Sequence, residues 1–353
     1  MPTGPTIAFL VETRAPGGTA ASVAEDLRAL EGHVALRLHA LGASMFRGRP
    51  PAPALDPWAR VLRPAGGTVG ADVVVMHNPS FLRQDEAPPC RIVTPHLVVV
   101  AHENFLLPDG TEAFDVGRCL GGLARASLAG RRSIAPVSPG NRRTVTAWLA
   151  RNPGFAGWDV LGEDWAAIFP GPFLAPSARP ADRRGRMSRP GPEKFPDLAT
   201  LDLVFPATAA SNVIMGGEPL AAAARRRPHW RILPFRSLDH RTFFGLIDFF
   251  VYFTAPRLRE SLGRVLGEAV AAGKVAITDP ATAENLGGAA IGADPREVEG
   301  LVRGLLADPA AYGERVRAGQ AALARRSAAA FRDRVLPMLG PAAPPPPRHR
   351  LPA

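Results

Sequence analysis

Two glutamates, Glu260 and Glu268, are spaced so that they could bind the two ends of one ligand. They lie between apolar runs at 249–253 and 275–278. If the segment between these runs forms a helix, the two carboxylates lie about 10–12 Å apart, because a helix rises about 1.5 Å per residue. That distance suits a sugar nucleotide: the N–H groups of a helix beginning near 261–263 would face the diphosphate, Glu268 would bind the ribose, and Glu260 would reach the hexose. The alternative is an exposed amphipathic helix with two solvated glutamates.

A diphosphate also requires fixed positive charge, and the segment 184–194 contains it. Arg186 offers a planar fork of donors, and Lys194 offers a compact point charge. Lys194 is one of two lysines among 42 basic residues, which indicates a specific requirement for it. The alternative is a flexible basic loop.

Two loops in the first half of the chain could line the same ligand from the other side. Gly17 and Gly18 lie between an apolar run at 7–11 and a helical pattern at 22–30. Glycines at such a turn let the backbone approach a phosphate or a sugar closely. His102 directly follows another apolar run and would face the same cleft. The alternatives are an ordinary strand-to-helix turn and a histidine that caps a loop.

These residues need elements to position them, and the apolar pattern predicts strands separated by helices. The predicted strands are at 7–11, 73–76, 97–101, 134–137, 212–215, 249–253 and 275–278, and the clearest helices are at 22–30, 264–272 and 297–307. Strands that alternate with helices form parallel sheets, and ligands bind outside the carboxyl ends of the strands. We therefore predict an α/β protein with two Rossmann-like domains facing a cleft.

Prolines set the predicted domain boundaries. The proline-rich run 171–180 is the predicted linker, because neither a helix interior nor a central strand accepts such a sequence. It separates an N-terminal domain over 1–170 from a C-terminal domain over 181–335. Residues 336–353 form a predicted proline-rich, disordered tail.

The segment that begins at Glu260 resembles the E-x7-E signature of the retaining glycosyltransferases of family 4, which have the GT-B fold. The match includes Ser261, Leu262 and Gly263, and the resemblance extends over roughly residues 5–330. It implies that Glu260 contacts the transferred sugar and that Glu268 holds the donor ribose. It also implies that residues 261–263 line the donor site, that the domain over 181–335 binds the nucleotide sugar, and that the domain over 1–170 lies on the acceptor side.

The resemblance includes weaker motifs in the expected order. It implies that Arg186 and Lys194 clamp the donor diphosphate, although their spacing is wider than the family's usual pattern. It implies that Gly17 and Gly18 line the donor site from the opposite domain. His102 resembles the family's active-site histidine, which contacts the sugar near the reacting carbon.

The function implied by the resemblance is retaining transfer of a hexose from a nucleotide-sugar donor to a hydroxyl acceptor. The acceptor would be a glycan or a lipid-linked molecule in cell-envelope or exopolysaccharide synthesis. The sequence contains no Asp-x-Asp pair, so we expect transfer without a metal or another cofactor. Two alternatives remain open: a non-catalytic binding or scaffold protein with the GT-B fold, and a nucleotide-sugar epimerase.

Charge and composition restrict the partners and the location. The net charge is +10, but the arginines are scattered and accompany no nucleic-acid-binding motif, so we expect no nucleic-acid partner. The N-terminus has no basic leader, which predicts a cytoplasmic protein. The helical pattern at 141–151 carries arginines beside apolar residues and would allow peripheral contact with the inner face of the membrane. A core-packing helix with solvated arginines is the alternative.

Overall fold

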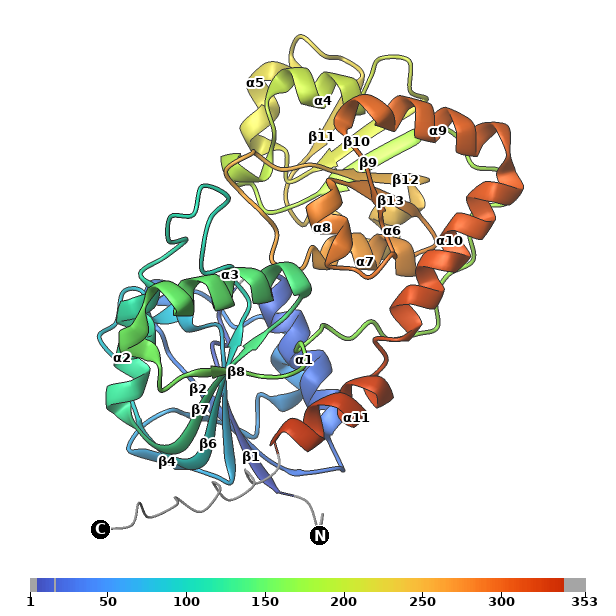
Figure 1. Ribbon diagram of the computed structural model, residues 1–353. Helices are drawn as coiled ribbons and strands as arrows, with labels where there is room; N and C mark the ends of the chain where they lie inside the picture. The colour runs from blue at the N-terminus through green and yellow to red at the C-terminus, as the bar shows by residue number, and fades with distance from the viewer. Residues whose placement is uncertain (1–4, 16, 340–353) are drawn as a thin grey trace, which may run out of the picture.

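The structure, a computed structural model, describes residues 5–15 and 17–339. It contains two α/β domains, each built around one parallel sheet (Figure 1). The predicted fold class is therefore confirmed. Each of the seven predicted strands corresponds to one observed strand, and the three predicted helices are present.

The first domain has an eight-stranded sheet in the order β3-β2-β1-β5-β6-β7-β8, and β4 pairs with β6. Its strands are β1 (Thr6–Val11), β2 (Ala35–Ala40), β3 (Leu62–Pro64), β4 (Thr68–Gly70), β5 (Val73–His77), β6 (Arg91–Ala101), β7 (Ser127–Pro136) and β8 (Asp159–Val160). Its helices are α1 (Gly18–Leu30), α2 (Val116–Ala126) and α3 (Pro139–Arg151).

Alternate residues along the central strands of this sheet enter two different cores. Phe9 and Val75 pack in the cluster that contains α1, whereas Leu10 and Val74 pack in the cluster that contains residues of α2 and α3. Every residue of β5 is buried. A parallel sheet covered on both faces needs such continuous apolar strands, which is why the sequence predicts them well.

The second domain has a six-stranded sheet in the order β11-β10-β9-β12-β13-β14. Its strands are β9 (Arg183–Met187), β10 (Ser211–Met215), β11 (Trp230–Leu233), β12 (Phe249–Tyr252), β13 (Val275–Thr278) and β14 (Ile291–Gly292). Its helices are α4 (Leu198–Val204), α5 (Ala221–Ala224), α6 (His240–Gly245), α7 (Arg264–Ala271), α8 (Pro280–Glu284), α9 (Val298–Ala307) and α10 (Pro309–Ala324). The strand order reverses between β9 and β12, and such a reversal opens a crevice at the carboxyl ends of the two strands.

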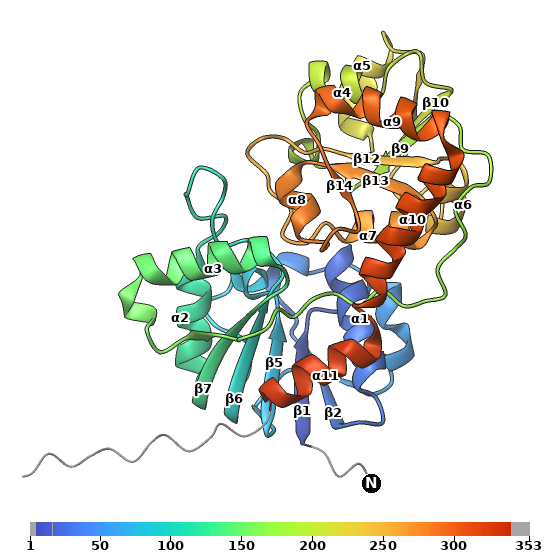
Figure 2. The same cartoon turned by 45° about the vertical axis from the view of Figure 1, so that its right-hand side comes forward.

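The last described helix, α11 (Ala328–Leu339), returns to the first domain and packs against α1 (Figure 2). Phe331 and Val335 are buried in the same cluster as α1. The second domain thus ends before the predicted boundary at 335, because these apolar side chains complete the core of the first domain. The predicted tail over 336–353 begins inside α11, and its residues 340–353 lie outside the described residues.

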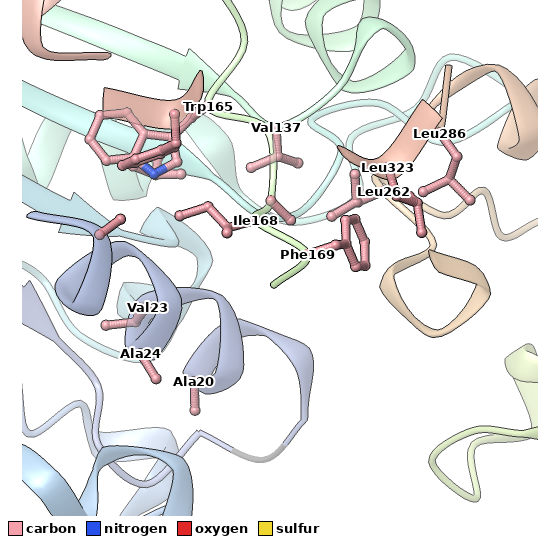
Figure 3. Packing of buried hydrophobic residues seen from close by; sticks show 14 of the residues in the cluster. Ala20, Val23, Ala24, Val137, Trp165, Ile168, Phe169, Leu262, Leu286 and Leu323 are labelled. Carbon is pink, nitrogen blue, oxygen red and sulfur yellow. The ribbon is translucent and has the colours of Figure 1, made fainter. Parts of the chain in front are cut away.

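One apolar cluster joins the two domains. Figure 3 shows Trp165, Ile168 and Phe169 of the connecting segment running between Val23 of α1 and Leu262 of the second domain. All five side chains are buried. Burial of apolar surface is the main favourable term in association, so this cluster fixes how the domains face each other.

Candidate functional site

Glu260 lies in the loop after β12 and forms an ion pair with Lys194, which follows β9. Lys194 Nζ is 2.7 Å from Glu260 Oε1, and the Tyr252 hydroxyl donates to the same oxygen at 2.8 Å. Burial raises the pKa of Glu260, but the charge and hydrogen bond of Lys194, together with Tyr252, outweigh burial and hold that pKa below its ordinary value. The side chains of Lys194 and Glu260 are 13% and 17% exposed, so this ionised pair reaches the surface at the crevice between β9 and β12.

Arg186 lies behind this pair and is fully buried in β9. Its guanidinium donates to the Phe253 carbonyl at 2.8 Å and to the Lys194 carbonyl at 2.5 Å. It also lies between the rings of Phe195 and Tyr252, at 4.3 and 4.7 Å from their centroids. Burial lowers the pKa of Arg186 to about 10. In this arrangement Arg186 supports the loop that carries Lys194, and its side chain does not reach the solvent.

Helix α7 begins at Arg264, after Gly263 in the left-handed region with φ of 76°. Among the described residues, no side chain caps this N-terminus. Free N–H groups at a helix N-terminus attract anions. Leu262 is buried in the interdomain cluster, so it can offer a ligand only its backbone. One turn along α7, Arg264 Nε donates to Glu268 at 2.9 Å, and His240 Nδ1 lies 3.6 Å from the other oxygen of that carboxylate.

Glu268 also lines a pocket of about 390 Å³ between the domains. The pocket is bounded by Glu25 of α1, His240 of α6 and Phe169 of the connecting segment. The ion pair of Glu260 lies outside it. The two predicted glutamates therefore do not line one pocket, and the first turn of α7 separates them.

The glycine turn of the first domain faces two arginines of the second. A Cβ atom on Gly17 would lie 3.8 Å from Arg189 Cδ, and one on Gly18 would lie 3.5 Å from Arg264 Cδ. Gly17 has φ of 97°, a conformation that other residues rarely adopt. The glycines therefore allow a close approach of the first domain to the charged side of the crevice.

The loop around Glu260 is hydrogen-bonded to the first domain. Ser261 Oγ donates to the His102 carbonyl at 2.6 Å, and Asn104 Nδ2 donates to the Arg259 carbonyl at 3.0 Å. These bonds bring the loop of His102 against the loop of Glu260. Residues more than 150 positions apart in the sequence thereby meet at one edge of the cleft.

Asn285 forms a second link between the domains and is fully buried. Its Oδ1 accepts from the Gly140 N–H at 3.0 Å, and its Nδ2 donates to the Glu260 carbonyl at 3.1 Å. It therefore holds the Glu260 loop to the N-terminus of α3. Nothing in the spacing of the sequence indicates this asparagine.

His102 itself contacts a second histidine. His102 Nε2 lies 2.9 Å from Nδ1 of His77, the last residue of β5. Burial and the nearby Arg264 lower the pKa of His102 to about 3, so its imidazole is neutral at physiological pH. The sequence analysis did not assign His77 to the site, although it ends a strand at the same edge of the sheet.

Sequence reasoning also did not assign Tyr252, Arg189 or Arg264. A signal for Arg264 was available, because it lies four residues before Glu268, the spacing of a helical ion pair. Tyr252 occupies the last position of a strand that leads to Glu260, and such positions at the carboxyl edge often face ligands. The contact of Arg189 with the glycine turn depends on how the domains face each other.

Helix α3 is a candidate membrane contact, but its arginines bond to other parts of the protein. Arg142 donates to Asp164 at 2.8 Å, Arg143 forms two hydrogen bonds with Glu284 of the second domain, and Arg151 donates to a carbonyl. These contacts favour the interpretation of α3 as a core-packing helix.

Over residues 5–15 and 17–339, no helix has the length and apolarity needed to cross a membrane. In the same ranges, no group of three or more His, Cys, Asp or Glu side chains could hold a metal ion.

Neither a protein-family model nor a characterised protein sequence matches this chain. The fold, however, is similar to those of solved structures. HepE from Anabaena, solved in complex with UDP-glucose, superposes with a TM-score of 0.65 at 14% identity, over 95% of this chain and 99% of that one.

Two further structures show the same likeness. An α-glucosyltransferase in complex with UDP and a 13-mer DNA containing an HMU base has a TM-score of 0.59 at 10% identity, over 95% of this chain and 99% of that one. The trehalose-6-phosphate synthase OtsA has a TM-score of 0.56 at 13% identity, over 95% of this chain and 98% of that one. At these identities the likeness establishes the fold, which is the GT-B arrangement of two Rossmann-like domains facing a cleft.

Proposed function

We propose that this chain is a glycosyltransferase that moves a sugar from a nucleotide-sugar donor to a hydroxyl acceptor with retention of the anomeric configuration, as the E-x7-E resemblance implies. The observation that carries the proposal is the charged pair of Lys194 and Glu260 at the crevice of the second domain. The uncapped N-terminus of α7 follows this pair, and His102 of the other domain lies against the same loop. Groups suited to bind an anion and groups suited to bind a sugar thus lie next to one another.

The donor would bind mainly to the second domain. Lys194, Arg189 and the N–H groups at the start of α7 would bind the diphosphate, because they supply fixed positive charge on one side of the crevice. Glu268 would accept hydrogen bonds from the ribose, since its side chain lines the pocket between the domains and Arg264 holds one oxygen of its carboxylate in place. The structures of HepE and of the α-glucosyltransferase hold UDP-glucose and UDP, which supports this class of donor.

The residues of the first domain would border the sugar. Gly17 and Gly18 would let the backbone approach the donor, and His102 would contact the hexose opposite Glu260. Ser261 and Gly263 would shape the donor site through their backbone. Arg186 would act indirectly, by holding the Lys194 carbonyl, and so we assign it a positioning role in place of the direct phosphate contact expected from the sequence.

The reaction would need no protein nucleophile. The bond between the anomeric carbon and the phosphate oxygen breaks, the acceptor oxygen bonds to that carbon on the same face, and the acceptor proton passes to the departing phosphate. Lys194 and the α7 N-terminus would stabilise the negative charge that develops on the leaving group. Because the protein supplies this charge, transfer should survive chelation of divalent metals. Activity abolished by EDTA and restored by magnesium or manganese would contradict this assignment.

We further propose a glycan or lipid-linked acceptor, a role in cell-envelope or exopolysaccharide synthesis, and a cytoplasmic location with possible action at the inner face of the membrane. The family 4 assignment rests on the E-x7-E segment. These finer statements rest on the resemblance in the sequence.

The test is a panel of nucleoside diphosphates and their sugars, measured first for binding and then for acceptor-dependent release of the nucleoside diphosphate. A ligand at 100 times its Kd should stabilise the protein by about 2.7 kcal/mol. Glu268→Ala should weaken binding of the nucleoside diphosphate roughly 30- to 150-fold, since a charge-assisted interaction with two hydroxyls contributes about 2–3 kcal/mol.

Glu314→Ala, a change of an exposed glutamate on α10, is the matched control and should bind normally. Tight binding without transfer to any acceptor would identify a non-catalytic protein. Conversion of the donor sugar without an acceptor would identify an epimerase. Equal affinity of wild type and Glu268→Ala would remove Glu268 from the donor site.

A further inference from the structure

Three polar side chains, His102, His77 and Asp26, form a row that runs from the cleft into the core of the first domain. His77 Nδ1 is 2.9 Å from His102 Nε2, and the His77 side chain is fully buried. Its ring stacks on Phe9, with centroids 5.5 Å apart and planes 19° apart, and meets the edge of Trp165 at 6.1 Å. These contacts hold the imidazole of His77 in one orientation, with one nitrogen toward His102 and the other toward α1.

Asp26 of α1 lies at the inner end of this row and is 1% exposed. Its Oδ2 accepts from Trp165 Nε1 at 2.8 Å and lies 3.9 Å from His77 Nε2. Among the described residues, neither His77 Nε2 nor Asp26 Oδ1 has a hydrogen-bond partner. An unsatisfied buried polar group costs about 1–3 kcal/mol, so one such atom on each of two neighbouring buried side chains requires an explanation.

The unpaired His77 Nε2 is explained if one proton occupies the space between Asp26 Oδ2 and His77 Nε2, and Asp26 Oδ1 is then an uncharged carbonyl oxygen, which costs less to bury unpaired than a carboxylate oxygen does. A shift of about 1 Å would bring Asp26 Oδ2, which lies 3.9 Å from His77 Nε2, to hydrogen-bond distance. When Asp26 is protonated, it can donate to His77 Nε2. His77 must then carry its own proton on Nδ1 and donate to His102 Nε2. His102 is thereby left with its proton on Nδ1, as a donor toward the cleft.

Ionisation of Asp26 moves the proton of each histidine in this row to its other ring nitrogen. The carboxylate favours a proton on His77 Nε2, which leaves His77 Nδ1 as an acceptor. His102 then carries its proton on Nε2, and its Nδ1 becomes an acceptor toward the cleft. The hydrogen bond of one ring nitrogen fixes the tautomer of a neutral histidine, so the three groups change together.

The charged groups around the row favour the protonated form at neutral pH. Burial raises the pKa of Asp26 to about 8, against the hydrogen bond from Trp165 and the charges of Arg264 on α7 and Arg334 on α11. Glu25, on the same helix, raises that pKa further. Burial also lowers the pKa of His77 well below its ordinary value, so this ring is neutral too.

We propose that Asp26 and His77 are positioning residues that fix the tautomer of His102, so that its Nδ1–H group faces the cleft as a hydrogen-bond donor at neutral pH. A donor at this position suits an oxygen of the sugar or of the leaving phosphate. That use of the donor rests on the proposed function, whereas the tautomer itself does not.

The tautomer can be measured directly in the free protein by long-range ¹H–¹⁵N correlation of ¹⁵N-histidine-labelled samples. We expect the proton of His102 on Nδ1 at pH 6–7 and on Nε2 at pH 9, where about ten Asp26 carboxyls are ionised for each one protonated. In Asp26→Asn, the amide can donate to His77 at every pH, so the tautomer of His102 should not change with pH. A His102 proton on Nε2 at pH 6–7 in the wild type, or an unchanged pH transition in Asp26→Asn, would overturn the proposal.

Two variants of His77 separate its hydrogen bond from its bulk. His77→Asn places an amide N–H where Nδ1 stood and keeps the donation to His102, whereas His77→Phe keeps the bulk and removes the bond. We expect His77→Phe to lower kcat about 10- to 100-fold with donor Kd changed less than twofold, because a small misplacement of a reacting group has effects of that size. His77→Asn should recover most of that loss. We expect the kcat of the wild type to decrease from pH 7 to 9, as His102 Nδ1 changes from donor to acceptor, and the kcat of His77→Asn should not show this decrease.

His96→Phe is the control, because His96 is another buried histidine and hydrogen-bonds Ser133 at a distance from the cleft. Equal losses of kcat in His77→Phe and His77→Asn would overturn the positioning role. If the tautomer changes as expected but no nucleotide sugar is turned over, the proposed function fails and the role of the row in setting the tautomer stands.

Discussion

Replacement of Asn285 should loosen the contact between the domains without unfolding either of them. Asn285→Ala removes two hydrogen bonds, one from the Gly140 N–H and one to the Glu260 carbonyl. Each such bond contributes about 1 kcal/mol net when its partner can reach water after the change. The interface can open and hydrate both groups, so we expect the free energy of local opening to fall by about 2 kcal/mol.

Native-state hydrogen exchange measured by mass spectrometry reports this opening directly. A loss of about 2 kcal/mol corresponds to about 30-fold faster exchange in peptides covering 138–141 and 259–263, while the central strands should keep their protection. Gly140→Ala should have the same effect with Asn285 intact, because its Cβ would lie 2.6 Å from Asn285 Oδ1.

The control is Asn212→Ala, which removes a buried asparagine bonded only within the second domain, to the Pro206 carbonyl at 2.8 Å. It should change exchange near β10 and leave 138–141 unaffected. Unchanged exchange at 138–141 in both Asn285→Ala and Gly140→Ala would refute the inference that this hydrogen-bond pair holds the Glu260 loop to the first domain.

Two further predictions concern the site and its support. Lys194→Met should raise the pKa of Glu260, because it removes the largest opposition to burial and leaves only Tyr252 and Arg189, and it should destabilise the protein by about 1–3 kcal/mol at pH 7. Wild-type Glu260 has a lowered pKa, so its contribution to stability is present above its unfolded pKa and is lost as pH falls through its folded pKa. The difference in stability between wild type and Lys194→Met should therefore be smaller in thermal melts at pH 4 than at pH 7. An equal difference at both pH values would contradict the ion pair. Gly267→Ala places a Cβ 2.4 Å from the Phe169 ring and should cost about 1–3 kcal/mol in denaturant titrations. Gly304→Ala on α9, with nothing within 4 Å, should instead stabilise by about 0.5–1 kcal/mol, and similar effects of the two changes would refute the close packing at Phe169.

The sequence predicted the strands that form the centres of both sheets. The run Val73–Val74–Val75–Met76 is apolar at every position, as a strand covered on both faces must be. Such a pattern needs only local information, because the preference of neighbouring residues for an extended, buried conformation does not depend on which other strand they meet. The position of α7 after Gly263 was predicted for the same reason.

Strand β9 was not predicted, because its sequence, Arg-Arg-Gly-Arg-Met, looks like a surface loop. Its Arg184 is nevertheless buried, because Asp182, Glu299 and the Val204 carbonyl satisfy its guanidinium. Arg186 is buried against carbonyls and two aromatic rings. A buried charge is tolerated only when partners surround it, and most of these partners come from other parts of the chain.

The sequence by itself determined the α/β class and the crossover pattern, since both follow from local patterns. It also nominated Glu260, Glu268, Lys194 and His102 as candidate residues, through their types, their spacing and their resemblance to the motifs of a known family. Only the tertiary structure decided that Arg186 supports the site from behind, that Asn285 links the domains, and that Asp26 lies within reach of the row leading to His102. The physical reason is that hydrogen bonds and burial act over a few ångströms. Which distant residues come within that range is set by the packing of the two domains and leaves no periodic signal in the chain.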